Sequence, residues 1–306
     1  MLQYLNILLD DASGSFCHYE SEQEHKLMPL DILRQGIRFG MMENLMIQFV
    51  YPLEELPEEY AEVIESIDHF NIKPKEDDAD VIVLNEPVDI HTDKPVVLRI
   101  GKQDLFSHAK EIVSLIEHVA RLNVVIKDIE TFTDADFAKY KAFLEEVAAK
   151  IELMYVKGKA PQFNLLTDRL MLKQMNNCGA GDTTITLAPN GKFYICPAFY
   201  YEDENDDVGD LEHGLDIKNK QLYQLGHAPI CRHCDAWQCK RCIWLNRKTT
   251  LEVNTPSHEQ CVVAHLERNA SRLLLQNIRK HGSFLAEQED IPELDYIDPF
   301  DKRDEW

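Results

Sequence analysis

Residues 96–129 read VVLRIGKQDLFSHAKEIVSLIEHVARLNVVIKDI. The apolar run at 96–100 has the length of a buried strand, and the run at 123–129 predicts a second one. Between them, Phe106, Ala109, Ile112, Ile116 and Val119 recur at the spacing of one helical face. A strand, a helix and a second strand in this order predict two parallel strands joined by a helical crossover.

The same alternation of strand and helix extends over residues 1–155. Upstream strands are expected at 5–9, 46–51 and 81–84, with helices at 31–44 and 57–67. A longer downstream helix is marked by Phe137, Tyr140, Phe143, Leu144, Val147 and Ile151. This pattern predicts an α/β fold with parallel strands covered by helices, as either an open sheet or an incomplete barrel.

Composition limits the possible functions. The formal charge of −22 would repel a phosphate backbone, so a nucleic-acid partner is not expected. No stretch reaches the roughly 18 consecutive apolar residues of a membrane span. Residues 2–9 also lack the flanks of a secretory signal, so we expect a cytoplasmic protein without a membrane partner.

Three segments are expected along the chain. An α/β unit occupies 1–160, with the junction at 157–161, and a cysteine-rich unit occupies 161–282. Residues 283–306 form an acidic tail that we expect to be solvated or loosely docked.

Seven of the eight cysteines lie between residues 178 and 261. A cytosolic compartment keeps thiols reduced, so metal ligation is expected rather than disulfides. One tetrahedral zinc would use four thiolates and leave three over, whereas two cubane clusters take up to eight ligands. The number therefore favours two iron–sulfur clusters. The candidate ligands are Cys178, Cys196, Cys231, Cys234, Cys239, Cys242 and Cys261.

Local patterns indicate how these cysteines meet. Cys231 with Cys234, and Cys239 with Cys242, have the Cys-x-x-Cys spacing that lets both sulfurs reach one metal centre. Two strand patterns, at 184–187 and 192–195, flank a turn at 189–191, and this hairpin would bring Cys178 close to Cys196. Ser257 is expected to cap a helix that carries Cys261 in its first turn and continues to Ile278.

Other side chains near the cysteines have two interpretations each. Five basic residues either offset the negative charge of thiolate-bound cores or form a solvated face: Arg232, Lys240, Arg241, Arg247 and Lys248. Trp237 and Trp244 either shield the metal from water or pack as ordinary core. His233 is expected to donate a hydrogen bond to a ligand sulfur. No spacing of acidic residues indicates a proton-transfer pair, so no catalytic residue is predicted.

The order of these cysteines around Gly191 resembles the SPASM domain of radical S-adenosylmethionine (SAM) peptide-modifying enzymes. The resemblance implies two auxiliary 4Fe-4S clusters, the first with an open or non-cysteine position. The first would be held by Cys178, Cys196 and Cys242, and the second by Cys231, Cys234, Cys239 and Cys261. The central spacing is Cys-x2-Cys-x4-Cys-x2-Cys, where the family has Cys-x2-Cys-x5-Cys-x3-Cys.

The whole chain, including residues 47–52 and 178–182, is similar to the maturases of Cys-x-x-x (CXXX) repeat peptides. That similarity implies a degenerate partial (β/α) barrel, like that of radical SAM enzymes, followed by the SPASM domain. It also implies a ribosomal precursor peptide with cysteine repeats as partner, and possible action with a further maturation enzyme.

Two family motifs of the SAM-cleaving site are replaced in this sequence. The Cys-x3-Cys-x2-Cys motif expected after the first strand is reduced to Cys17 within residues 15–19. The Gly-Gly-Glu-Pro segment expected after the second strand is replaced by Val50-Tyr51-Pro52-Leu53-Glu54. Neither the SAM-cleaving cluster nor bound SAM is therefore expected.

Three functions follow as hypotheses, and whether the protein is an enzyme is left open. The leading one is an iron–sulfur protein in maturation of a cysteine-containing ribosomal peptide, whose clusters conduct electrons or bind a substrate thiolate. The second is an active SAM enzyme with atypical cluster ligation, and the third is a zinc-stapled peptide-binding or scaffold protein. Cys17 is a relic of the lost motif, a reactive thiol or a core residue, and His18 and His25 are alternative nitrogen donors.

Overall fold

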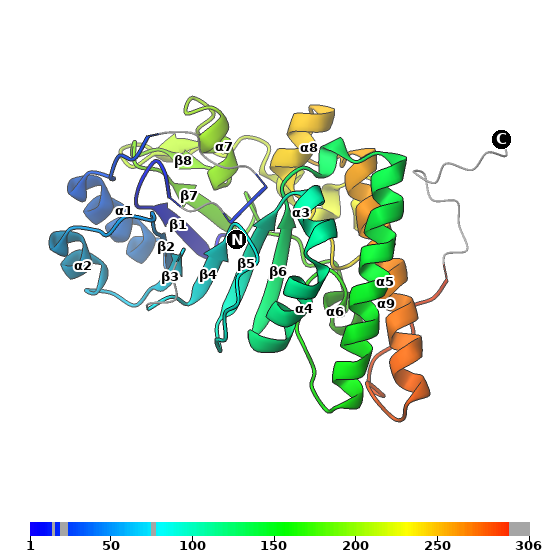
Figure 1. Ribbon diagram of the computed structural model, residues 1–306. Coiled ribbons are helices and arrows are strands. Elements are labelled where there is room, and N and C mark those ends of the chain that lie inside the picture. Colours follow the sequence, from blue (N-terminus) through cyan, green and yellow to red (C-terminus); the bar gives the residue numbers. More distant parts are fainter. Residues whose placement is uncertain (14–15, 19–23, 75–77, 294–306) are drawn as a thin grey trace.

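The computed structural model describes residues 1–13, 16–18, 24–74 and 78–293 (Figure 1). Within these ranges, eight strands form one sheet in the order β6-β5-β4-β3-β2-β1-β7-β8. The strands are β1 (Tyr4–Leu8), β2 (Met46–Val50), β3 (Phe70–Lys73), β4 (Val81–Leu84), β5 (Pro95–Ile100), β6 (Arg121–Ile126), β7 (Thr184–Leu187) and β8 (Phe193–Tyr194). A separate pair is formed by β9 (Gly209–Asp210) and β10 (Gly214–Leu215).

The sheet is almost entirely parallel. Strands β1 to β6 lie side by side in chain order, and β7 joins the free side of β1, also in parallel. Only β8 runs antiparallel, paired with β7. The strand order is linear with β6 and β8 at its ends, so these strands do not close into a barrel. The predicted α/β class with parallel strands is thereby confirmed.

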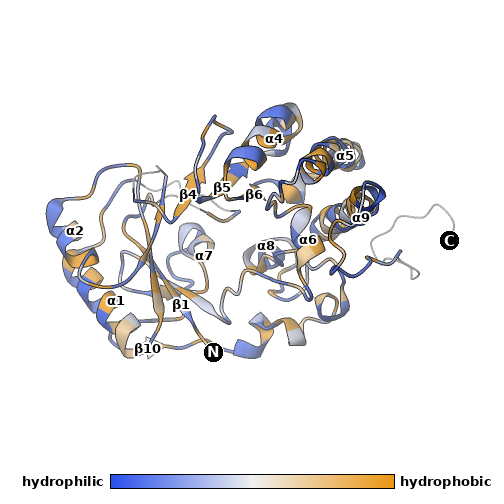
Figure 2. Cartoon of the chain, turned by 90° about the horizontal axis from the view of Figure 1, so that it is seen from below, coloured by the Kyte–Doolittle hydropathy of each residue, from blue (hydrophilic) through white to orange (hydrophobic). Residues whose placement is uncertain are grey.

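Helices cover both faces of this sheet. They are α1 (Leu30–Met42), α2 (Glu58–Ile64), α3 (Lys102–Ser107), α4 (Ala109–His118), α5 (Asp134–Val156), α6 (Thr167–Met171), α7 (Pro197–Glu202), α8 (Ile243–Thr250) and α9 (His258–Lys280). Figure 2 shows α4 and α5 on one side of β5 and β6, and α7 and α8 on the other. Because Cys196 immediately precedes α7 and Cys242 precedes α8, both cysteines belong to the side opposite α4.

Three local features differ from the sequence prediction. Strand β3 was not predicted, because its four residues are too few to show a periodicity. The single helix expected between β5 and β6 is divided at His108, whose φ of −112° and ψ of 32° leave the helical region. The strand expected at 123–129 ends at Ile126, because Asp128 turns to accept a hydrogen bond from the Lys102 amide and Ile129 begins a 3₁₀ turn.

The two halves of the chain share one sheet and one core. Strand β7 pairs with β1, and α9 lies alongside α5 (Figure 1). A single cluster of buried apolar residues extends from Leu5 to Ile291. Helix α5 ends at Val156 and is followed by Gly158 with φ of +79°, so the chain turns at the expected junction. The division of the chain into functional units stays a prediction.

Glu267 joins α9 to α5 in the interior. It is 6% exposed, and its carboxylate accepts a 2.6 Å hydrogen bond from the Tyr140 hydroxyl and a 3.2 Å bond from Gln238 Nε2. Burial raises the pKa of Glu267 to about 7 from an ordinary value of 4.5. Between about pH 5 and about pH 7 the folded protein therefore keeps a proton on Glu267 that the unfolded chain has already lost.

This proton gives the stability a pH dependence. Between pH 4.5 and about 7 the folded state binds more protons than the unfolded state, so the contribution of Glu267 to stability falls as the pH rises. We expect Glu267→Gln, which stays neutral, to gain about 2 kcal/mol relative to wild type between about pH 5.5 and about pH 8. Urea unfolding followed by circular dichroism measures this difference. Glu146→Gln on the exposed face of α5 is the control, and an effect of Glu267→Gln that does not change with pH would contradict the assignment.

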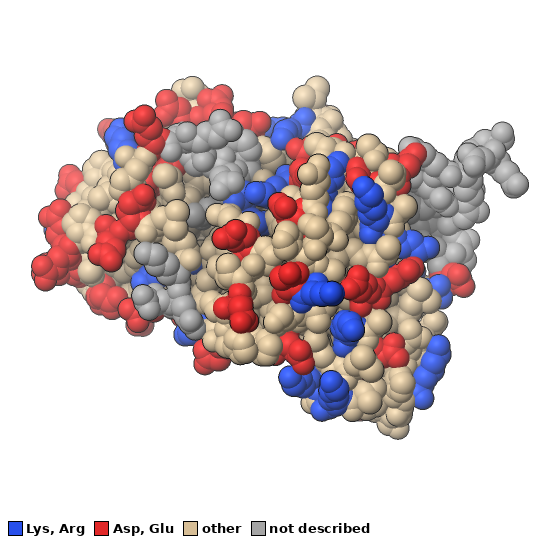
Figure 3. All heavy atoms as spheres, viewed as in Figure 1, with Lys and Arg blue, Asp and Glu red and all other residues tan. Residues whose placement is uncertain are grey.

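The surface matches the acidic composition. Acidic side chains are spread over the face shown in Figure 3, with basic ones interspersed mainly on its right-hand part. Among the helices in the described residues, none combines the length and apolar character needed to cross a membrane.

Candidate metal centre

Four of the seven candidate cysteines line one cavity of about 340 Å³. Cys231, Cys234 and Cys239 come from the loop that precedes α8, and Cys261 comes from the first turn of α9. Ser257 begins that helix as predicted, with its hydroxyl accepting a hydrogen bond from the Gln260 amide. The fold thus brings together the four residues that the SPASM resemblance places on the second cluster.

Hydrogen-bond donors point at the sulfurs of this group. The Ala236 amide donates to Cys234 Sγ at 3.4 Å, and the Arg241 amide donates to Cys239 Sγ at 3.4 Å. Such amide donors stabilise thiolate charge and tune a cluster's potential. The Cys-x-x-Cys loops are therefore folded with their amides toward the sulfurs.

His265 also contacts the ligand group, although the sequence pattern did not single it out. Its Nε2 lies 3.5 Å from Cys234 Sγ. The available signal was its position four residues after Cys261, which places both side chains on one face of α9. His233, expected to make such a contact, lines the same cavity, and its role stays a prediction.

Burial of the thiols in this group disfavours their negatively charged thiolate form. Burial raises the pKa of Cys231 to about 11 and that of Cys239 to about 12. At neutral pH both therefore hold protons when no cation is bound. Metal binding replaces such protons, because a cationic centre stabilises the thiolate directly.

Arg241 supplies a buried positive charge between the two halves of the cysteine constellation. It is 2% exposed and lines both the 340 Å³ cavity and a neighbouring cavity of about 270 Å³. Its Nη2 donates to the Tyr223 carbonyl, whereas its Nε and Nη1 have no hydrogen-bond partner among the described residues. Buried guanidinium donors without a partner fit an anionic group next to them, and a thiolate-bound iron–sulfur core is such a group.

The remaining three candidate ligands form a second group together with Cys17. Burial raises the pKa of the Cys196 thiol well above its ordinary value, and the charges of Cys17, Cys242 and Cys178 raise it further. Burial also raises the pKa of Cys242, with added contributions from Cys178 and Cys17. Cys178 and Cys242 also line one cavity of about 270 Å³, together with Phe16 and His18 on either side of Cys17.

The predicted hairpin explains how Cys178 and Cys196 approach each other. Strands β7 and β8 pair in antiparallel register, and Gly191 closes the turn by donating its amide to the Ala188 carbonyl at 3.0 Å. Gly191 has φ of +79°, the left-handed region that glycine adopts without steric cost. Cys178 is exposed and Cys196 is partly buried, so this group reaches from the interior to the surface.

The two tryptophans have different surroundings. Trp237 packs in a small apolar cluster with Met175, Cys231, Cys234 and Cys239, and the Arg169 guanidinium stacks on its ring at 4.0 Å. Trp244 is 2% exposed and donates from Nε1 to Glu202 at 2.8 Å. Trp237 therefore covers the cysteine group, whereas Trp244 anchors α8.

Cys17 and the two nearby histidines lie in the segment after β1, where Ser15 and Tyr19 fall outside the described residues. The Cys17 carbonyl accepts a 2.8 Å hydrogen bond from Arg99 Nε, and His18 Nδ1 lies 2.8 Å from the Ile126 carbonyl. Burial lowers the pKa of His18. His25 Nδ1 lies 3.0 Å from an Asp10 carboxylate oxygen.

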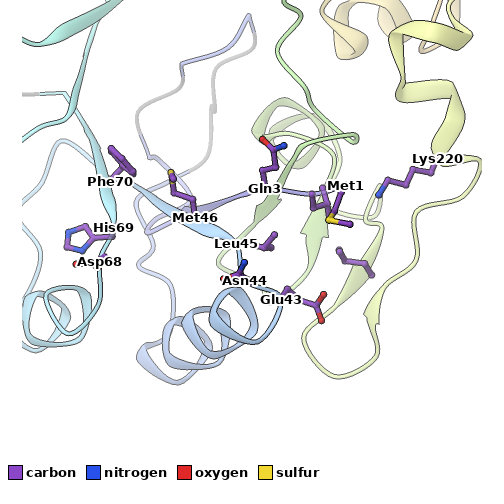
Figure 4. Close-up of a pocket in the computed structure, with 12 residues that line it drawn as sticks. Met1, Gln3, Glu43, Asn44, Leu45, Met46, Asp68, His69, Phe70 and Lys220 are labelled. Atoms are coloured by element: carbon purple, nitrogen blue, oxygen red, sulfur yellow. The ribbon is translucent and has the colours of Figure 1, made fainter.

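A larger cavity lies elsewhere and contains none of the candidate ligands. It measures about 1080 Å³ and is formed around the amino-terminal ends of β1, β2 and β3, where Gln3, Met46 and Phe70 line it (Figure 4). Across the described part of the chain, no set of three or more His, Cys, Asp or Glu side chains is arranged to hold a single metal ion.

Comparison with known proteins adds information about the fold. No family model matches the chain, and none of the curated proteins matches it. Among solved structures, native anSMEcpe with bound AdoMet and Cp18Cys peptide is similar over 90% of this chain and 99% of its own, with a TM-score of 0.59 and 14% identity. Hexahistidine-tagged anSMEcpe with bound AdoMet gives a TM-score of 0.58 at 13% identity, over 92% and 97%.

The chain shares the fold of anSMEcpe. The likeness spans nearly the whole of both chains. An α/β fold of this type is what the strand and helix alternation predicts.

Proposed function

We propose that this protein is an iron–sulfur protein that acts in the maturation of a ribosomally synthesised, cysteine-containing peptide. It consists of a degenerate radical-SAM-like unit at 1–160, a SPASM-like unit with two 4Fe-4S clusters at 161–282 and an acidic tail. The observation that carries the proposal is the enclosure of one cavity by Cys231, Cys234, Cys239 and Cys261. The cavity that Cys178 and Cys242 share, and the hairpin between Cys178 and Cys196, support a second centre.

The chain's own residues define what each part of the site does. The thiolates hold the inorganic cores, the Ala236 and Arg241 amides donate to sulfur, and the buried Arg241 guanidinium offsets negative charge. Trp237 limits the access of water. When bound, the clusters supply one-electron transfer.

The peptide part of the proposal is supported by the shared fold and by charge. One of the structures with this fold contains a bound peptide, Cp18Cys. The net charge of −22 favours association with a basic peptide segment and disfavours nucleic acid. SAM cleavage is not part of the proposal, because the segment after β1 offers one cysteine where a catalytic cluster takes three.

Metal analysis of protein purified without oxygen tests the proposal. We expect about eight irons and about eight sulfides per chain, with the broad visible absorption of 4Fe-4S clusters. Incubation of the reduced protein with SAM should give no 5′-deoxyadenosine. A colourless protein with one zinc and no sulfide would refute the cluster assignment, and production of 5′-deoxyadenosine would show an active radical enzyme instead.

The same sample tests the peptide partner. The fluorescence anisotropy of a labelled synthetic peptide with Cys-x-x-x repeats should rise when the cluster-containing protein is added. The control peptide carries serine at each cysteine position. Equal binding of the two peptides would contradict the recognition of a cysteine-containing substrate.

A further inference from the structure

We propose that Cys17 is the fourth protein ligand of the first cluster, completing the set formed by Cys178, Cys196 and Cys242. This inference rests on the proposed function, because it presumes that these three cysteines hold iron. It goes beyond that proposal by assigning the position that the seven-cysteine pattern leaves open.

The cavity next to the first group supports the assignment. The two neighbours of Cys17 in the chain, Phe16 and His18, line the same 270 Å³ cavity as Cys178 and Cys242. Because Phe16 and His18 both line this cavity, the backbone of Cys17 between them lies at the cavity wall. The ligand set therefore draws on the amino-terminal segment as well as on the cysteine-rich half.

Main-chain contacts fix this segment against the sheet. Arg99 on β5 is fully buried and donates from Nε to the Cys17 carbonyl at 2.8 Å, while its Nη1 donates to Asn85 Oδ1 at 3.0 Å. His18 meets the end of β6 through the Ile126 carbonyl at 2.8 Å. A buried arginine oriented by two partners holds the backbone at Cys17 in one position.

Helix α7 fixes the same segment from the side of Cys196. The helix begins directly after Cys196, and its Tyr201 hydroxyl donates to the Ser13 carbonyl at 3.1 Å. Its Tyr200 hydroxyl donates to Asp11 at 2.5 Å. Two consecutive side chains of α7 thus tie the segment leading to Cys17 to the helix that presents Cys196.

Four protein thiolates change what the first cluster can do. With each iron held by one cysteine, no iron is open to a substrate thiolate. The first cluster then serves electron transfer, and capture of a peptide thiolate at iron is excluded. The single cysteine after β1 has a structural role in the auxiliary site.

Oxidation of the purified clusters tests this ligand. In Cys17→Ala one iron lacks a protein thiolate, so treatment with ferricyanide should release about one iron per chain and give the electron paramagnetic resonance signal of a three-iron cluster. Wild type should keep its four-iron clusters under the same treatment. Addition of 2-mercaptoethanol should make the cluster of Cys17→Ala resistant to ferricyanide again, because the small thiolate binds the open iron.

Phe16→Ala and Cys17→Ser provide the comparison. Phe16→Ala alters the same cavity wall and should behave like wild type, whereas Cys17→Ser keeps an oxygen ligand and should lie between wild type and Cys17→Ala. If Cys17→Ala resists oxidation as well as wild type does, Cys17 is not a ligand, although the clusters themselves stand. If wild type contains no iron, the proposed function fails together with this assignment.

Discussion

Replacement of Cys234 by alanine is expected to halve the cluster content of protein exposed to air, from about eight to about four irons per chain. Cys234 shares its cavity with Cys231, Cys239 and Cys261, and its sulfur accepts from the Ala236 amide. A cubane that loses one of four thiolates at a partly exposed position is readily degraded by oxygen. The four irons that remain belong to the first cluster, which uses none of these ligands.

A matched variant in the other group makes this expectation specific. After the same exposure to air, Cys196→Ala should also leave about four irons, but these belong to the second cluster and should give the electron paramagnetic resonance spectrum that Cys234→Ala lacks. The double variant should contain none. If both single variants lost the same spectrum, or if either emptied both sites, the division of the cysteines into two groups would be wrong.

The fold followed from local sequence patterns because its strands are buried on both faces. Leu5, Ile7 and Leu8 in β1 and Val96 and Leu98 in β5 are all fully buried. Continuous apolar runs of this kind are visible in a sequence without any tertiary information. Strand β3 was not predicted because Asn71 and Lys73 interrupt its short apolar run. It forms a strand because it pairs with β2 and β4.

The cysteine groups were only partly predictable. Cys-x-x-Cys spacing and the hairpin at Gly191 are local, so they indicated which residues could share a centre. Cys17 could not be placed by spacing, because its position depends on Arg99 in β5 and on Tyr201 in α7, which are distant in sequence. Likewise, the buried donors of Arg241 that have no partner among the described residues become evident only when the loop is folded.

Asp235 holds the central cysteine loop in place, and Asp235→Asn is expected to lower the stability by about 3 kcal/mol. The Asp235 carboxylate accepts from Arg268 Nε at 2.9 Å and Nη2 at 2.6 Å, and Arg169 Nη2 lies 3.6 Å away. The side chains of these arginines are only 1% and 6% exposed. Removing the carboxylate leaves two buried guanidinium groups facing each other, and that uncompensated charge causes the loss.

Asp235→Asn should also weaken the binding of the second cluster. Because Asp235 follows Cys234 directly, and Arg169 also stacks on Trp237, a displaced loop moves the Cys234 ligand and the Trp237 ring. A loss of this size corresponds to a fall in the thermal midpoint of roughly 5 °C, and a chelator should remove the second cluster faster than the first.

Asp216→Asn is the matched control for this expectation. Its partner Lys218 and Asp216 itself are 77% and 65% exposed, so the loss should stay below about 1 kcal/mol. Equal effects of the two substitutions would mean that the buried arginines are compensated by groups other than Asp235. A large loss of stability in Asp235→Asn but not in Asp216→Asn, with faster chelation of the second cluster only, would show that Asp235 stabilises both the loop and the cluster that the loop binds.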